Sequence, residues 1–149
     1  MRIIYFDYEM LMRTYEKTIE VSGGGISGVK DKGQIESVLD HIQNDLYYPT
    51  FETKLTHLFF SLNKFHCFND GNKRIAISAG ALFLNLNGYV FRIAEFITEM
   101  ENISYHLAAG KIDKEFLKEI ITAIIYDDFD NEELKLKIYS VISKDLQNQ

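Results

Sequence analysis

Residues 72–87, NKRIAISAGALFLNLN, decide the fold. From position 75 onward this stretch is apolar on nearly every side of the helix that it predicts. A helix of that kind is buried at the centre of a domain. Gly88 follows directly and predicts the C-terminal stop of the helix. The stretch therefore predicts a central buried helix around which the rest of the chain packs.

The flanking segments predict further helices. Over about residues 50–65 the apolar side chains recur at helical spacing, as Phe51, Leu55, Leu58, Phe59, Leu62 and Phe65. Further helices are expected from Asp7 to about residue 21 and from Asp31 to about residue 43, with these two aspartates as N-caps. Three more are expected over about 94–109, 113–126 and 130–146, the last two with Asp113 and Asp130 as N-caps. Residues 44–49 are expected to form an extended connector. The pattern predicts an all-α domain, with a short N-terminal strand over residues 2–6 as an optional addition.

Composition narrows the class of protein. The chain has 149 residues, 46% of them hydrophobic and 26% charged, which is typical of one soluble globular domain. A net charge of −6 weighs against a non-specific nucleic-acid binder, although it leaves room for a local basic pocket. We see no signal-peptide pattern and no apolar run of the ~18 residues that a membrane span needs. We therefore expect a cytoplasmic protein that binds neither membrane nor nucleic acid.

The polar residues are concentrated in HCFNDGNKR, residues 66–74. This run leads into the N-terminus of the most apolar helix, where unpaired N–H groups and the helix dipole favour an anion. Gly71 lets the backbone approach a ligand closely. Lys73 and Arg74 add positive charge, and an arginine can hold a phosphate through two parallel hydrogen bonds. The run therefore predicts a phosphate-binding site.

Two further residues add reaction chemistry to this site. Asp70 beside a phosphate suggests Mg²⁺, which is usually held by one or two carboxylates and by substrate phosphates. His66 can accept a proton from a hydroxyl at neutral pH. Phe68 is expected to turn into the core and to support the run. Together these residues indicate phosphoryl or nucleotidyl transfer.

Purely structural roles compete with this interpretation. His66 alone could be a capping or core histidine, and Asp70 could be an N-cap. Lys73 and Arg74 could form a solvated first turn, but positive charge there opposes the helix dipole unless an anion is bound. Cys67, the only cysteine, is expected to fill the loop. We expect structural or exposed roles for the other histidines, which are His41, His57 and His106.

The run resembles the Fic/Doc family motif, in which His-x-Phe-x-(Asp/Glu)-(Gly/Ala)-Asn precedes a basic residue. The resemblance extends to 22–40, 48–66, 79–89 and 106–121 and implies the family's helical bundle. It predicts a Fic/Doc domain over residues 1–126. Residues 127–149 are then an additional C-terminal helix, packed on the domain or on a partner. The resemblance also implies a flap, which we place at Tyr47 and Tyr48 as a hypothesis for target docking.

Two positions favour the Doc branch of the family. Adenylyl-transferring Fic enzymes usually read GNGR with a second arginine three residues on, whereas this chain has Lys73 and Ile77 at the two deciding positions. The Doc resemblance implies a toxin that transfers phosphate from ATP to a threonine of elongation factor Tu. It implies His66 as the base, Asp70 as the Mg²⁺ ligand, and phosphate binding by Asn72, Lys73 and Arg74.

Other functions remain open. Gly71, where Doc itself has alanine, leaves a Fic-like anion cradle possible, so an adenylyltransferase is the first alternative and a non-catalytic binding module the second. Some Fic proteins carry an inhibitory helix with the pattern Ser/Thr-x-x-x-Glu-Gly/Asn. Residues 1–25 and 125–149 show no such pattern. We therefore expect inhibition in trans by a separate antitoxin that folds on binding.

Overall fold

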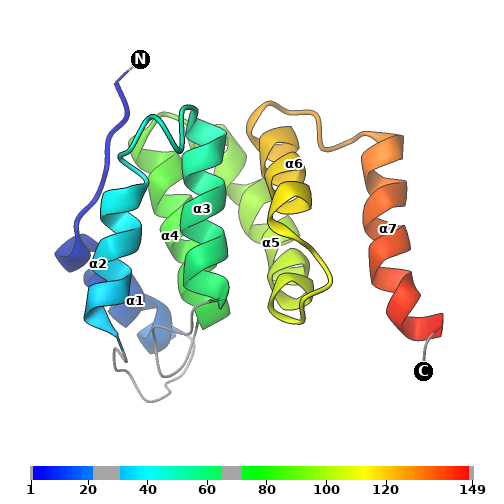
Figure 1. Ribbon diagram of the computed structural model, residues 1–149, viewed down its shortest axis with the longest axis horizontal. Coiled ribbons are helices and arrows are strands. Elements are labelled where there is room, and N and C mark those ends of the chain that lie inside the picture. Colours follow the sequence, from blue (N-terminus) through cyan, green and yellow to red (C-terminus); the bar gives the residue numbers. More distant parts are fainter. Residues whose placement is uncertain (1, 22–30, 65–71, 148–149) are drawn as a thin grey trace.

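The computed structural model describes residues 2–21, 31–64 and 72–147, without the side chains of residues 18–21, 72 and 144–147. Within these residues the chain forms seven α-helices and one 3₁₀-helix, and no strand (Figure 1). The elements are α1 (Tyr8–Val21), α2 (Lys32–His41), α3 (Phe51–Lys64), α4 (Asn72–Leu86), the 3₁₀-helix η1 (Val90–Arg92), α5 (Ile93–Ala108), α6 (Lys114–Ile125) and α7 (Glu132–Gln147). The prediction of an all-α helical bundle is confirmed.

Two helices share the centre of the bundle. α4 contacts α1, α3 and α5, and α3 contacts α2, α4, α5 and α6. The fully buried apolar side chains of α4 are Ile75, Ala76, Ala79, Phe83 and Leu84. Ile77, Ala81, Leu82 and Leu86 are only half-buried. The predicted central helix therefore has one open side, and the amphipathic α3 is as central as α4.

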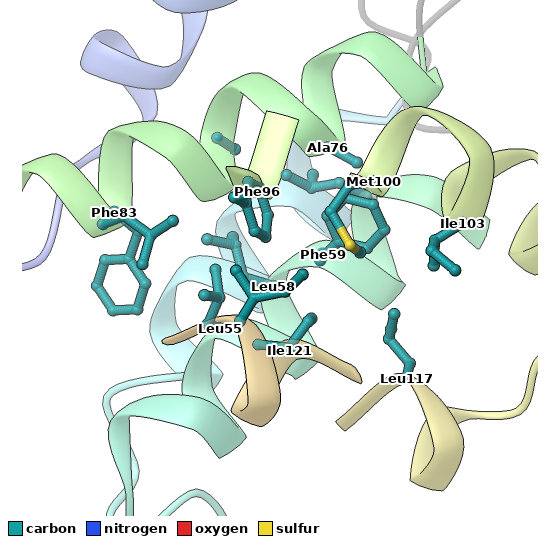
Figure 2. Close-up of a cluster of buried hydrophobic side chains, with 14 of the residues drawn as sticks. Leu55, Leu58, Phe59, Ala76, Phe83, Phe96, Met100, Ile103, Leu117 and Ile121 are labelled. Carbon is teal, nitrogen blue, oxygen red and sulfur yellow. The ribbon is translucent and has the colours of Figure 1, made fainter. Parts of the chain in front are cut away.

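The core between α3, α4 and α5 is tightly packed (Figure 2). The rings of Phe59 on α3 and Phe96 on α5 meet edge to face, with centroids 6.0 Å apart. On α4 the residues facing this pair include Ala76 and Gly80. A Cβ at Gly80 would lie 2.5 Å from the ring of Phe96, which is far inside van der Waals contact. The lack of a side chain at Gly80 therefore sets how closely α5 approaches α4.

Three helices end with the same backbone motif. Gly88 after α4 and Gly110 after α5 have φ angles of +84° and +82°. The following residue then donates its N–H to the carbonyl five positions back, at 2.9 Å after α4 and 3.0 Å after α5. The stop predicted at Gly88 is confirmed. After α6 the same left-handed position is held by Asp127, with φ +58°, and its carboxylate pairs with Arg92 of η1 at 2.8 Å.

Three of the four aspartates predicted as N-caps begin their helices, and the prediction for Asp130 is wrong. Asp31 and Asp113 each accept a hydrogen bond from the backbone N–H three residues on, at 2.9 and 2.7 Å. At the start of α7 this role belongs to Asn131, which accepts the corresponding N–H at 3.1 Å. The predicted cap Asp130 instead forms an ion pair with Lys135. The polar pair Asp130-Asn131 therefore divides its roles differently from the prediction.

The N-terminal segment is not the strand that the sequence suggested. Residues 2–7 have no regular structure. Instead, Ile4 donates its N–H to Oδ1 of Asn87 at 2.7 Å, and Nδ2 of Asn87 donates to the carbonyl of Ile4 at 2.9 Å. Asp7 then begins α1 by accepting the N–H of Met10 at 2.9 Å, as predicted. The side chain of Asn87, just after α4, thus makes both hydrogen bonds with Ile4 that a neighbouring strand would otherwise make.

The connector before α3 is also not extended as predicted. Residues 42–47 form successive turns. Oδ1 of Asn44 accepts the N–H groups of Leu46 and Tyr47, at 2.9 and 3.4 Å. A carboxamide that bonds to the backbone two and three residues on favours a turn. This connector contains no flap hairpin.

α7 lies along the edge of the bundle, beside α6 (Figure 1). Leu134 is buried, and Lys137 pairs with Glu119 of α6 at 2.8 Å while its ammonium lies over the ring of Phe116. The division into a 1–126 domain and an additional helix stays a prediction. Among the described helices, none combines the length and the apolar character that crossing a membrane requires.

Candidate active site

The predicted catalytic run, residues 66–74, begins two residues after the end of α3 at Lys64 and extends into the first turn of α4, which begins at Asn72. Four of its predicted site residues lie outside the described residues: His66, Phe68, Asp70 and Gly71. The side chain of Asn72 is also outside them. The roles predicted for these residues stay predictions. What the structure places is the end of α3, the start of α4 and the elements that hold both.

The first turn of α4 is the described part of the predicted phosphate site. Lys73 is exposed and Arg74 is half-buried, and the turn contains no acidic residue. The first N–H groups of a helix have no partner within it, and the dipole makes this end positive. Two cations at such a position repel each other and also oppose the helix dipole, and a bound anion offsets both effects. The electrostatics therefore fit a bound phosphate.

The donor set also fits Mg²⁺ with a nucleotide. Mg²⁺ keeps several waters and takes few protein ligands, so one carboxylate at Asp70 beside nucleotide phosphates satisfies its chemistry. Among the described residues there is no group of three or more His, Cys, Asp or Glu side chains that could hold a metal ion. In the acidic stretch after α6, Asp127 and Asp130 each pair with a basic side chain. These two carboxylates are therefore engaged in ion pairs.

The end of α3 is tied to the end of α5 by two hydrogen bonds that sequence reasoning missed. Nδ2 of Asn63 donates to the carbonyl of Ser104 at 3.2 Å, and Asn63 is only 1% exposed. Nζ of Lys64 donates to the carbonyl of Leu107 at 3.0 Å. Asn63 follows Phe59 by four residues and so lies on the buried side of α3, which was the available signal. His66 is the second residue after Lys64.

A second polar cluster surrounds His57 in the middle of α3. The hydroxyl of Tyr48 lies 3.0 Å and Nζ of Lys114 lies 2.9 Å from Nδ1 of His57. Burial, together with Lys114 and His41, lowers the pKa of His57 to about 4. The imidazole is thus neutral near pH 7 and accepts at Nδ1, which leaves its proton on Nε2, 3.5 Å from Oγ of Ser61. This histidine holds α3, α6 and the preceding connector together, in agreement with the structural role predicted.

The connector tyrosines lie at the opposite end of α3 from the catalytic run. Tyr48 stacks on His57 with ring centroids 4.4 Å apart, while Tyr47 is 73% exposed. The 14 residues of α3 rise by about 20 Å from Phe51 to Lys64. The target-docking role suggested for Tyr47 and Tyr48 stays a hypothesis.

Comparison with known proteins agrees with the fold and the motif. The model of the Fic/DOC family matches residues 5–84, which include α1 to α3, the run 66–74 and most of α4. The chain is also similar to "Protein kinase doc" of Escherichia phage P1, with 36% identity over 69 residues. That match covers 44% of this chain and 54% of the phage protein, so it spans about half the length of the relative. The chain belongs to the Fic/DOC family.

Proposed function

We propose that this protein is a Doc-like phosphotransferase that moves the γ-phosphate of ATP to a hydroxyl group of a target protein. The observation that carries the proposal is the first turn of α4, which begins at the end of the family motif, contains Lys73 and Arg74, and has no acidic residue of its own. Gly71, Asn72, Lys73 and Arg74 bind the phosphates. Phe68 holds the run against the core.

In the proposed reaction, His66 removes the proton from the target hydroxyl as its oxygen attacks the γ-phosphorus. The bond between the γ-phosphorus and the bridging oxygen breaks, and ADP leaves with the electron pair. Asp70 would hold Mg²⁺, which supplies positive charge to the phosphate oxygens. Lys73 and Arg74 stabilise the charge that develops on the leaving group.

Transfer of AMP by the same run is the second candidate. Fic adenylyltransferases use a second arginine at the position that Ile77 occupies here. Ile77 is half-buried and packs against the core, so this position offers no donor to a nucleotide. This observation favours phosphoryl transfer. A binding module without catalytic activity is the third candidate, and the complete set of His66, Asp70 and Asn72 speaks against it.

The name of the phage relative and the family resemblance suggest the biological setting. We propose that the protein is the toxin of a toxin–antitoxin pair in the cytoplasm, that its target is a translation factor such as elongation factor Tu, and that a separate antitoxin inhibits it.

The deciding experiment uses ATP labelled separately at the α and γ phosphates, with Mg²⁺ and elongation factor Tu as the acceptor. Label from the γ position on the acceptor supports the kinase, and label from the α position supports the adenylyltransferase. His66→Ala is the control, because it removes the base while leaving the described core untouched. If wild type and His66→Ala arrest growth equally on expression, the catalytic proposal fails.

A further inference from the structure

The ends of α3 and α5 meet beside the point where the catalytic run begins. Phe59 contacts Phe96 in the first half of α5, and four residues later Asn63 contacts Ser104 in its last turns. The two helices therefore run in the same direction, and their C-terminal ends lie together. The two side chains that join them, Asn63 and Lys64, are the last two residues of α3.

Both hydrogen bonds use carbonyls near the end of α5. The last carbonyls of a helix lack partners within it, and that end of the dipole is negative. Lys64 brings a positive charge to this end by donating to the carbonyl of Leu107, which also accepts the N–H of Gly110 at 3.0 Å. The contact therefore stabilises the end of α5 and fixes the last turn of α3 at the same time.

The carboxamide of Asn63 lowers the stability of the core in one respect, because one of its polar atoms is buried and, within the described part of the chain, unpaired. Its Nδ2 is bonded, but its buried Oδ1 has no hydrogen-bond partner among the residues that the structure describes. A leucine at this position would bury no unpaired acceptor. The amide thus serves for its directed hydrogen bond to Ser104 and not for the best stability of the core.

We propose that Asn63 and Lys64 are positioning residues for the catalytic run. They fix the final turn of α3 against α5, and so they fix the point from which the chain continues to His66, two residues later. This inference rests on the proposed function. Positioning matters because catalysis by a general base depends on near-attack geometry, and a displacement of about 1 Å can lower the rate about 100-fold.

The chain offers a matched control on the same helix. Lys54 is 1% exposed, and its Nζ donates to the carbonyl of Ile42 at 2.8 Å and to Asp45 at 2.7 Å. Lys54 and Lys64 thus both anchor α3 through a backbone carbonyl. They lie ten residues apart, which is about 15 Å along the helix, and only Lys64 is next to the catalytic run.

The experiment compares Lys64→Met, Lys64→Arg and Asn63→Leu with Lys54→Met. For each variant, thermal unfolding, amide hydrogen exchange of residues 65–71, and kcat and KM for ATP in γ-phosphate transfer to elongation factor Tu are measured. We expect Lys64→Met and Asn63→Leu to exchange faster at 65–71 and to lower kcat about 10- to 100-fold, with KM for ATP within about twofold of wild type. Lys64→Arg retains a donor and should restore both values.

Lys54→Met should lower the unfolding temperature and leave exchange at 65–71 and kcat near wild type. The inference is overturned if Lys64→Met and Lys54→Met change exchange at 65–71 equally, or if both leave it unchanged. Failure of the proposed function has a different signature, because wild type itself then transfers no γ-phosphate. The exchange comparison decides the positioning role in either case.

Discussion

The carboxamide of Asn87 pairs with both backbone groups of Ile4, accepting its N–H at 2.7 Å and donating to its carbonyl at 2.9 Å. The same Nδ2 also donates to the carbonyl of Phe83 at 2.9 Å. One side chain thus joins two segments 83 residues apart in the sequence. It attaches the N-terminal segment to the end of α4, where the side chains of Tyr5 and Phe6 pack against the ring of Phe83.

Asn87→Ala should therefore destabilise the protein by about 1–2 kcal/mol, because it removes these hydrogen bonds and leaves partly buried backbone groups unpaired. Urea unfolding followed by circular dichroism measures the change. Asn85→Ala is the control, since Asn85 is exposed in the last turn of α4, two residues before Asn87. Equal stabilities of the two variants would contradict the role of Asn87.

Substitution of glycine by alanine should have opposite effects on stability at Gly80 and Gly33. Gly80→Ala should cost about 1–3 kcal/mol, because its Cβ would lie 2.5 Å from the ring of Phe96. Gly33→Ala in α2 should be neutral or stabilise by up to about 1 kcal/mol, because the nearest atom to its Cβ would be 3.6 Å away and alanine favours the helix. Thermal unfolding of both variants tests the pair. Destabilisation of similar size at both sites would show that backbone preference, and not the approach of Phe96, decides.

His57 predicts a loss of stability in acid. Its pKa is lowered to about 4 in the folded protein, by burial first and then by Lys114 and His41. The ordinary value of about 6.5 applies to the unfolded chain, so the unfolded state binds a proton first as the pH falls. The contribution of His57 is fully present well above pH 6.5 and is lost as the pH falls to 4, by at most about 3 kcal/mol. Urea unfolding between pH 4 and 7.5 measures this loss.

The variant His57→Gln isolates that contribution from those of other groups. Burial also lowers the pKa of His106, so wild type should lose stability in acid for more than one reason. His57→Gln should show a smaller loss between pH 6.5 and 4 than wild type, although it is less stable at pH 7. If the two curves run parallel, His57 does not titrate as the structure implies.

Asp70 predicts a metal-dependent effect on nucleotide binding. Asp70→Asn removes the charge of the proposed Mg²⁺ ligand and retains its size, so the affinity for ATP in the presence of Mg²⁺ should fall about tenfold or more. Titration calorimetry with and without Mg²⁺ measures the change. The affinity without Mg²⁺ should stay equal or rise, since one negative charge near the phosphates is lost. An unchanged affinity with Mg²⁺ would rule out Asp70 as the ligand.

The sequence predicted those features of the fold that depend on residues close together along the chain, such as the ends of helices. Helix caps such as Asp31 and Asp113, and the stop at Gly88, follow from residue type and local spacing. Before α7 two adjacent residues, Asp130 and Asn131, can both act as an N-cap, so local spacing does not choose between them. In the structure Asp130 pairs with Lys135 and Asn131 caps the helix. Local signals of this kind account for most of the helix boundaries.

Contacts between distant segments could not be predicted in the same way. Asn63 and Lys64 donate to carbonyls 41 and 43 residues away, and Asn87 pairs with Ile4, 83 residues away. In the candidate site, the chemistry of residues 66–74 could be inferred from residue types. The elements that hold the run in place required the structure.

The contact between Gly80 and Phe96 also has an evolutionary consequence. Any side chain at position 80 collides with this ring, whereas a smaller residue at position 96 would leave room for one. The order of substitution therefore matters: a methyl group at position 80 costs less stability once position 96 has lost its aromatic ring. Descendants that change both residues are expected to have passed through an intermediate with a cavity between α4 and α5, and in that background alanine at position 80 would become favourable.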